Sequence, residues 1–255
     1  MQLNYKTYGQ GEPLIILHGL FGSLDNWHTL AKKLGEQYQV FIIDQRNHGK
    51  SPHTSAMNYP AMAADIASFM DDQRLQQAFL AGHSMGGKTA MELALAQPER
   101  VKKLVSIDMT PFGLPGGHEN LFEAMNALDL SRISKRKEAD EALKPLIGDF
   151  GIRQFLLKNV ERAEEGGYRW KMNLPVIEAN YHYLMQGVVE ENRSFEKPTL
   201  FVKGARSDYL DPEQLASYQA VFPKAQLKSI AGVGHWVHAE APQAFQEVLE
   251  AFLAD

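Results

Sequence analysis

Two kinds of segment alternate along most of the chain, and this rhythm is the strongest constraint on its fold. Short apolar segments, bounded by turn residues, are separated by longer segments whose apolar residues recur at helical spacing. Most of the short segments lack strict polar–apolar alternation, which is typical of parallel strands covered on both faces by helices. The predicted strands are Leu14–Leu17, Val40–Ile43, Ala78–Ala81, Leu104–Ile107, Thr199–Val202 and Leu227–Ile230. The predicted helices between them are Asn26–Glu36, Pro60–Arg74, Met85–Gln97, Pro212–Val221 and Gln243–Leu253. The sequence therefore predicts an α/β fold with a parallel sheet and right-handed crossovers, to which the alternating segment Leu3–Tyr8 adds an antiparallel edge strand.

The rhythm breaks between Gly113 and Phe195, where helical patterns follow one another without a convincing buried strand. These patterns cover Leu121–Leu128, Lys135–Leu146, Arg153–Val160 and Val176–Met185. Proline and glycine mark both ends of the stretch. Open α/β sheets bind ligands beyond the carboxyl ends of their strands. We therefore expect residues 113–195 to form a helical cap, or lid, over a core made of residues 1–112 and 196–255.

Composition excludes several classes of function. The 255 residues carry 31 acidic and 26 basic side chains, a net charge of −5, so the overall field repels phosphate backbones and nucleic acid is not an expected partner. Cysteine is absent, which removes disulfides, thiolate zinc sites and a cysteine nucleophile. The sequence has neither a signal-peptide start nor an apolar window of membrane-spanning length. We expect a cytoplasmic protein without a membrane partner, and a monomer.

The segment Gly82-His83-Ser84-Met85-Gly86-Gly87 follows a predicted strand and opens a predicted helix. This is the pattern G-x-S-x-G in the context that its chemistry requires. A serine on a sharp strand-to-helix turn projects its hydroxyl from the sheet edge, and the flanking glycines leave room for neighbouring backbone. The Met85 amide would then lie beside an oxyanion formed by attack at Ser84. A second donor, the Leu20 amide, is predicted in the loop that follows the strand Leu14–Leu17.

A nucleophilic serine needs a base, and His235 is the best placed of the nine histidines. It follows the last predicted strand and precedes the final helix, so its loop overhangs the same sheet edge as Ser84. The base needs a carboxylate to fix its tautomer. Asp108 closes the strand after the nucleophile helix, and Asp208 follows the next strand. Both strand ends reach the same edge, so either aspartate can be the acid.

Five segments together resemble the α/β-hydrolase-fold serine esterases. They are Leu17–Ser23 (LHGLFGS), Asp44–Gly49 (DQRNHG), Gly82–Gly87 (GHSMGG), Ile107–Pro111 (IDMTP) and Gly232–Glu240 (GVGHWVHAE). Within that superfamily, nearly the whole chain resembles the bacterial YbfF-type esterases and their mitochondrial relatives. Asn47 is informative because the wider superfamily usually has glycine there, whereas this subgroup carries asparagine.

The resemblance implies a mostly parallel eight-stranded sheet with helices on both faces and a helical cap inserted after strand 6. It implies no cofactor and no metal. It also implies a triad of Ser84, His235 and Asp108, since the subgroup takes its acid from the strand after the nucleophile helix. Those relatives generally lack an aspartate at the place of Asp208, which stays the alternative acid.

The leading hypothesis is a serine hydrolase that cleaves carboxylic esters or thioesters of small to medium acyl groups through an acyl-enzyme intermediate. The expected substrate pocket is lined by Phe21, His83, Phe155, Tyr181 and Trp236. The only expected partner is a small-molecule ester or thioester.

Two alternatives use the same residues. A carbon–carbon bond hydrolase or a lyase would act on anionic substrates and would need arginines in the pocket, for which Arg46, Arg153, Arg162 and Arg169 are the candidates. A ligand receptor would keep the triad with negligible turnover. Haloalkane and epoxide hydrolysis are disfavoured because they need a carboxylate nucleophile where Ser84 stands.

Overall fold

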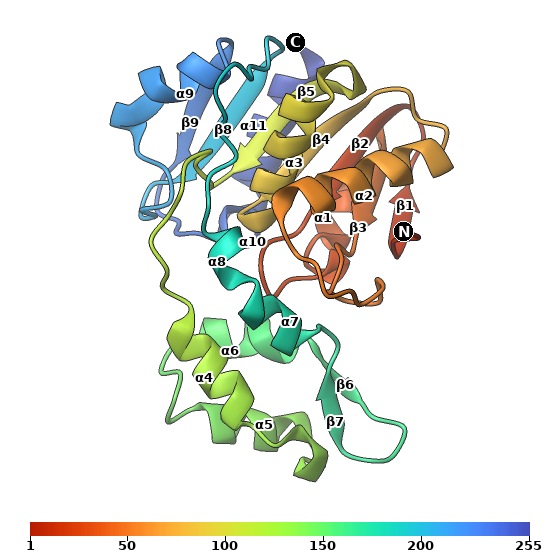
Figure 1. Cartoon of the computed structure of the whole chain (residues 1–255), viewed down its shortest axis with the longest axis vertical. Helices are drawn as coiled ribbons and strands as arrows, with labels where there is room; N and C mark the ends of the chain where they lie inside the picture. The colour runs from red at the N-terminus through yellow and green to blue at the C-terminus, as the bar shows by residue number, and fades with distance from the viewer.

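A computed structural model describes residues 1–255. Its central sheet has seven strands in the order β1-β3-β2-β4-β5-β8-β9 (Figure 1). All neighbours in the sheet are parallel except β1, which pairs antiparallel with β3 at one edge. The strands are β1 (Tyr5–Tyr8), β2 (Glu12–Leu17), β3 (Tyr38–Ile43), β4 (Ala78–His83), β5 (Val101–Ile107), β8 (Thr199–Gly204) and β9 (Ala225–Ile230). Each predicted strand therefore lies in the sheet, and Leu3–Tyr8 supplies the antiparallel edge.

Helices cover both faces of the sheet, as the unbroken apolar strands predict. Along β2, Leu14 and Ile16 pack on one side with α1 and α11, while Ile15 and Leu17 pack on the other with α2, α3 and α9. The helices of this core are α1 (His28–Leu34), α2 (Tyr59–Asp72), α3 (Met85–Ala96), α9 (Leu215–Val221), α10 (Val237–Glu240) and α11 (Pro242–Ala254). The N-cap of α2 is Asn58, whose side-chain oxygen accepts a hydrogen bond from the Ala61 amide at 2.9 Å.

The sheet departs from the expectation in its strand count and in the place of the insertion. Seven strands are present instead of eight, and β1 is the one strand that precedes β2. The inserted helices follow β5, the fifth strand along the chain, and not a sixth.

Residues 113–195, the inserted segment, add no strand to the central sheet. They form α4 (Glu119–Ala127), α5 (Arg136–Leu143), α6 (Phe150–Leu157), α7 (Leu174–Ala179) and α8 (Tyr181–Leu184), drawn in green and teal in Figure 1. Between α6 and α7 the chain makes an unexpected antiparallel hairpin of β6 (Val160–Arg162) and β7 (Tyr168–Trp170). The buried apolar side chains of the inserted segment belong to the same core cluster as those of α2 and α3.

Parallel pairing brings the carboxyl ends of β2, β4, β5, β8 and β9 to one edge of the sheet. The loops that leave these ends carry residues 18–22, Ser84, Asp108, residues 205–209 and His235. The fold thus gathers loops from distant parts of the chain at one place, where ligands of open α/β sheets bind.

Candidate active site

Ser84 occupies a strained turn between β4 and α3. Its backbone angles, φ 53° and ψ −121°, fall where only glycine is comfortable, and such outliers cluster at functional sites. Flanking glycines make the turn possible. A Cβ on Gly82 would lie 2.0 Å from the carbonyl oxygen of Gly86, and a Cβ on Gly86 would lie 2.5 Å from that of Leu17. The elbow predicted from the sequence is therefore present, and its glycines are required by close backbone contacts.

His235 pairs with Asp108. The Nδ1–H of His235 donates to Oδ2 of Asp108 at 2.7 Å, and the carboxylate is fully buried at the end of β5. Two further donors reach it, since the Gly204 amide bonds Oδ1 at 3.0 Å and the Ser207 hydroxyl bonds Oδ2. The alternative acid, Asp208, is exposed, and its side chain makes no hydrogen bond to His235.

Two aromatic rings hold the imidazole of His235. The ring of Tyr209 stacks on it with a centroid separation of 4.1 Å and an interplanar angle of 26°. The ring of His83 lies 4.6 Å away and donates from Nε2 to the backbone oxygen of His235 at 2.8 Å. Burial lowers the pKa of His83 well below its usual value, so His83 is a neutral neighbour. With Nδ1 bonded to Asp108, Nε2 is the nitrogen that remains for a reacting group.

Ser84 and His235 line the same pocket, although no hydrogen bond joins their side chains in this structure. Such bonds commonly tighten only when substrate is bound.

The loop after β2 turns tightly against the nucleophile. The Gly22 amide donates to the Gly19 carbonyl at 2.9 Å, and Phe21 adopts a left-handed φ of 58°. A Cβ on Gly19 would lie 3.1 Å from Cβ of Ser84, so the loop touches the elbow. The Leu20 amide donates no hydrogen bond within the protein. Of the two predicted oxyanion donors, Met85 directly follows Ser84 and Leu20 lies in the loop that contacts the elbow.

The pocket beside Ser84 has a volume of about 530 Å³. Four of the five predicted pocket residues line it, namely Phe21, His83, Phe155 and Trp236. The inserted segment contributes further lining from His118, Asn120, Leu121, Leu146, Ile147 and Ile152.

Tyr181 was expected in the pocket and is not there. Its hydroxyl lies 2.7 Å from Nδ1 of His118 and accepts a hydrogen bond from the His118 amide at 3.2 Å, and its ring packs edge-on against Phe122. Burial raises the pKa of Tyr181 to about 12. Tyr181 therefore contacts His118 from outside the pocket lining, because its position on α8 turns the ring toward the core.

Sequence reasoning missed Ser207 and Tyr209, which contact Asp108 and His235. Both flank Asp208, which the sequence did single out. Their position after β8, at the shared edge of the sheet, was the available signal. Residue type alone gave none, because serine and tyrosine are ordinary loop residues.

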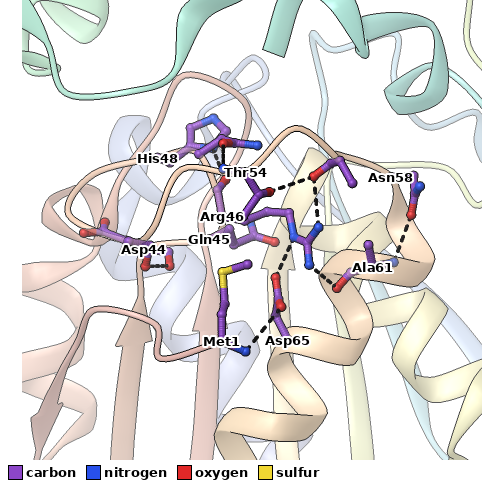
Figure 2. Close-up of polar contacts among 12 residues, drawn as sticks. Met1, Asp44, Gln45, Arg46, His48, Thr54, Asn58, Ala61 and Asp65 are labelled. Atoms are coloured by element: carbon purple, nitrogen blue, oxygen red, sulfur yellow. Dashed lines mark hydrogen bonds and ion pairs between the residues drawn. The ribbon is translucent and has the colours of Figure 1, made fainter. Parts of the chain in front are cut away.

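The arginines considered for an anionic substrate lie outside the pocket lining. Arg46 is buried beside α2, where Nε bonds Asp65 at 2.6 Å and its terminal nitrogens bond the carbonyls of Ala56 and Ala61 (Figure 2). Arg153 pairs with Asp140 at 2.8 Å. Arg162 lies over the ring of Tyr168 and Arg169 pairs with Glu161. Each of the four is thus engaged elsewhere.

No helix combines the length and apolar character that crossing a bilayer requires. No cluster of three or more histidine, aspartate or glutamate side chains is arranged to hold a metal ion.

The chain is similar to known proteins over almost its whole length. Residues 12–242 match the family model of the alpha/beta hydrolase fold. The chain is 38% identical to "Esterase YbfF" of Escherichia coli over 95% of this chain and 93% of that protein. It is 38% identical to "sn-1-specific diacylglycerol lipase ABHD11" of Mus musculus over 94% of this chain and 80% of that protein. A solved structure titled "Marine microorganism esterase" superposes with a TM-score of 0.96 at 42% identity, covering 98% of this chain and 99% of that one. The sheet, the serine elbow and these relatives together establish that the chain belongs to the α/β-hydrolase fold family.

Proposed function

We propose that the protein is a serine hydrolase that cleaves carboxylic esters through an acyl-enzyme intermediate, with Ser84 as nucleophile, His235 as base and Asp108 as acid. The observation that carries the proposal is the hydrogen bond from His235 to the buried Asp108, because His235 lines one pocket together with a serine on a strained elbow. Relatives named as an esterase and as a diacylglycerol lipase support ester hydrolysis as the reaction class.

In the first half-reaction, Oγ of Ser84 attacks the acyl carbonyl carbon as Nε2 of His235 removes the hydroxyl proton. Asp108 stabilises the imidazolium through its bond to Nδ1. The amides of Leu20 and Met85 donate to the oxyanion of the tetrahedral intermediate. The intermediate collapses as the C–O bond to the alcohol breaks, and His235 returns the proton to the departing alcohol oxygen.

In the second half-reaction, water replaces the alcohol. His235 takes a proton from water, the resulting hydroxide attacks the acyl-Ser84 carbonyl, and the second tetrahedral intermediate forms in the same oxyanion hole. Its collapse breaks the ester bond to Ser84, His235 protonates Oγ, and the carboxylic acid leaves.

The lining favours an apolar acyl group. Leu121, Leu146, Ile152, Phe155 and Trp236 surround the pocket, and lysine and arginine are absent from its lining. A volume of about 530 Å³ lies within the range of sites for single small molecules. We therefore propose small to medium acyl esters, with residues 113–195 acting as the cap over them.

The absence of lysine and arginine from the pocket lining also weighs against a carbon–carbon bond hydrolase or a lyase. Carbon–carbon bond hydrolysis of an anionic substrate would need a positive group in the pocket, and all four candidate arginines are engaged elsewhere. A receptor would bind an ester without releasing product.

The test is hydrolysis of a p-nitrophenyl ester series, with acyl thioesters in parallel, by the wild type, Ser84→Ala and Ser217→Ala. Ser217 is exposed on α9, outside the pocket lining, and is the matched control. We expect Ser84→Ala to lose on the order of 10⁶ in kcat and Ser217→Ala to retain wild-type activity. Full turnover by Ser84→Ala would overturn the mechanism, and binding without product release would favour the receptor.

A further inference from the structure

One side chain of the inserted segment reaches the loop that carries the Leu20 amide. Nδ2 of Asn159 donates to the backbone oxygen of Phe21, and Asn159 is 1% exposed. The opposite orientation of this amide would set two oxygens against each other, so the nitrogen is the atom that faces Phe21. The contact spans 138 positions of the sequence and joins the inserted segment to the predicted oxyanion loop.

Asn159 is itself held firmly. The backbone oxygen of Asn159 accepts a hydrogen bond from the Lys171 amide at 2.7 Å, which closes the base of the β6–β7 hairpin. The backbone N–H of Asn159 donates to the backbone oxygen of Leu156 at 2.9 Å. Two residues past Lys171, the Asn173 amide donates to the Asn47 carbonyl at 2.9 Å. The base of the hairpin is therefore bonded to two loops of the core, the one that contains Asn47 and the one that contains Phe21. Asn159 makes the bond to the second, which is the predicted oxyanion loop.

A continuous chain of hydrogen bonds runs from Asn159 to the Leu20 amide. The Phe21 carbonyl that Asn159 bonds shares its peptide group with the Gly22 amide, which donates to the Gly19 carbonyl at 2.9 Å. The Gly19 carbonyl in turn shares its peptide group with the Leu20 amide. Hydrogen bonds linked through peptide groups polarise one another, so each makes the next N–H a stronger donor. The Leu20 amide stands at the end of this chain with no partner in the protein.

We propose that Asn159 is a positioning residue for the oxyanion hole, which orients and polarises the Leu20 amide through the Phe21–Gly22 and Gly19–Leu20 peptide groups. The inference rests on the proposed function and extends it, because it assigns part of the transition-state machinery to the inserted segment. It also gives a role to an unusual side chain, since Oδ1 of Asn159 is buried without a hydrogen-bond partner. Leaving that oxygen unpaired costs stability, and the bond to Phe21 is the contact that retains the amide there.

The decisive variant is Asn159→Asp, which keeps the size of the side chain while a carboxylate cannot donate to a carbonyl. We expect kcat on a p-nitrophenyl ester to fall roughly 10–100-fold, with KM changed much less, because the lost support acts on the transition state. The affinity for a trifluoromethyl ketone, which forms an oxyanion with a catalytic serine, should weaken by the same factor as kcat/KM.

Asn180→Asp is the matched control. Nδ2 of Asn180 also joins the inserted segment to a core carbonyl, that of Ser55 at 3.2 Å, outside the pocket lining. We expect its kcat to stay near that of the wild type. Thermal unfolding of each variant verifies that the assays are made on folded protein, and Asn159→Leu, uncharged and of similar size, is measured if Asn159→Asp does not fold.

A pH series separates positioning from mere structural support. A protonated aspartic acid can donate to the Phe21 carbonyl, and burial raises the pKa of such a group. The ratio of Asn159→Asp to wild-type kcat/KM should therefore rise as the pH falls from about 8 to about 5.

The outcomes are distinct. If Ser84→Ala is inactive but folded Asn159→Asp matches Asn180→Asp in kcat and in ketone affinity, this inference fails and the proposed function stands. If Ser84→Ala retains full activity, the proposed function fails and takes this inference with it.

Discussion

The Asp108 carboxylate is fully buried, and an isolated charge there would be costly. Three donors offset that cost: His235, Gly204 at the end of β8, and Ser207 in the loop that follows β8. The loop after β8 therefore stabilises the Asp108 carboxylate by a hydrogen bond, although the acid itself comes from the end of β5. Its own aspartate, Asp208, points its charge at water, where it needs no partner.

This division of labour predicts unequal effects of two similar substitutions. Asp108→Asn should keep the geometry but lower kcat by about 10⁴, because an amide favours the wrong tautomer of the histidine. Asp208→Asn should leave kcat within about twofold, because the Asp208 side chain is exposed and makes no hydrogen bond to His235. Kinetics on one ester with both folded variants decides the matter. Equal, mild effects would mean that the acid has been misassigned.

The stack of Tyr209 on His235 allows a second prediction. A tyrosine face stabilises the imidazolium that forms in the transition state and restricts the ring. Tyr209→Ala should lower kcat roughly tenfold, whereas Tyr209→Phe, which keeps the ring, should stay near the wild type. If Tyr209→Phe falls as far as Tyr209→Ala, the hydroxyl is the group that matters and the stacking argument is wrong.

At this scale, motif and chain order were enough to predict Ser84 and His235 as candidates. They could not separate Asp108 from Asp208, since the ends of β5 and β8 lie side by side in the sheet. The choice depends on backbone detail such as the left-handed φ of 51° at Asp108, which no residue pattern specifies.

Among the elements, the junction of β4 and α3 is held by close contacts between main chains. The first turn of α3 rests on the end of β2, with Gly86 facing the carbonyls of Leu17 and His18. Because the contact is between main chains, neither side can give way as a flexible side chain would.

Gly86→Ala should therefore lower the free energy of unfolding by about 1–3 kcal/mol, as overpacking does. Gly113→Ala is the control, because its Cβ would meet nothing nearer than 3.5 Å. We expect that change to stay within about 1 kcal/mol. Urea unfolding of both variants is the measurement, and similar losses would show that the close approach at Gly86 is relieved by a small shift of α3.

The sequence could predict those elements whose apolar residues repeat at a regular spacing over many buried positions. The six parallel strands and the longer helices followed from the apolar pattern and from helix-start signals such as Asn58 before α2. The β6–β7 hairpin did not, because its strands have three residues each and are largely outside the core. Gly166 and Gly167 lie in the turn of that hairpin, with φ of 98° and 70°.

Over the whole molecule, a group of neutral histidines is buried around the active edge of the sheet. Burial lowers the pKa of His18 to about 4 and the pKa of both His48 and His238 to about 3, from a usual value of 6.5. His238 stacks on Trp27 with centroids 4.0 Å apart, and its Nδ1 has no hydrogen-bond partner. The ring of His238 acts as a packing group, whereas the rings of His18 and His48 also hydrogen-bond backbone atoms. The fold accepts all three rings only while they are uncharged.

Their burial makes the protein sensitive to acid. Between pH 6.5 and about 4, the unfolded chain binds protons at these histidines and the folded chain does not, so the free energy of unfolding falls as the pH falls. Each such histidine contributes a slope of up to about 1.4 kcal/mol per pH unit.

His238→Phe keeps an aromatic ring against Trp27 and should remove one such slope, while the exposed control His182→Gln should remove none. Urea unfolding at a series of pH values between about 7 and 5, above the range where carboxylates titrate, isolates the effect. A free energy of unfolding that is flat across this interval would mean that the buried rings accept protons in the folded state, and their role as neutral packing would have to be abandoned.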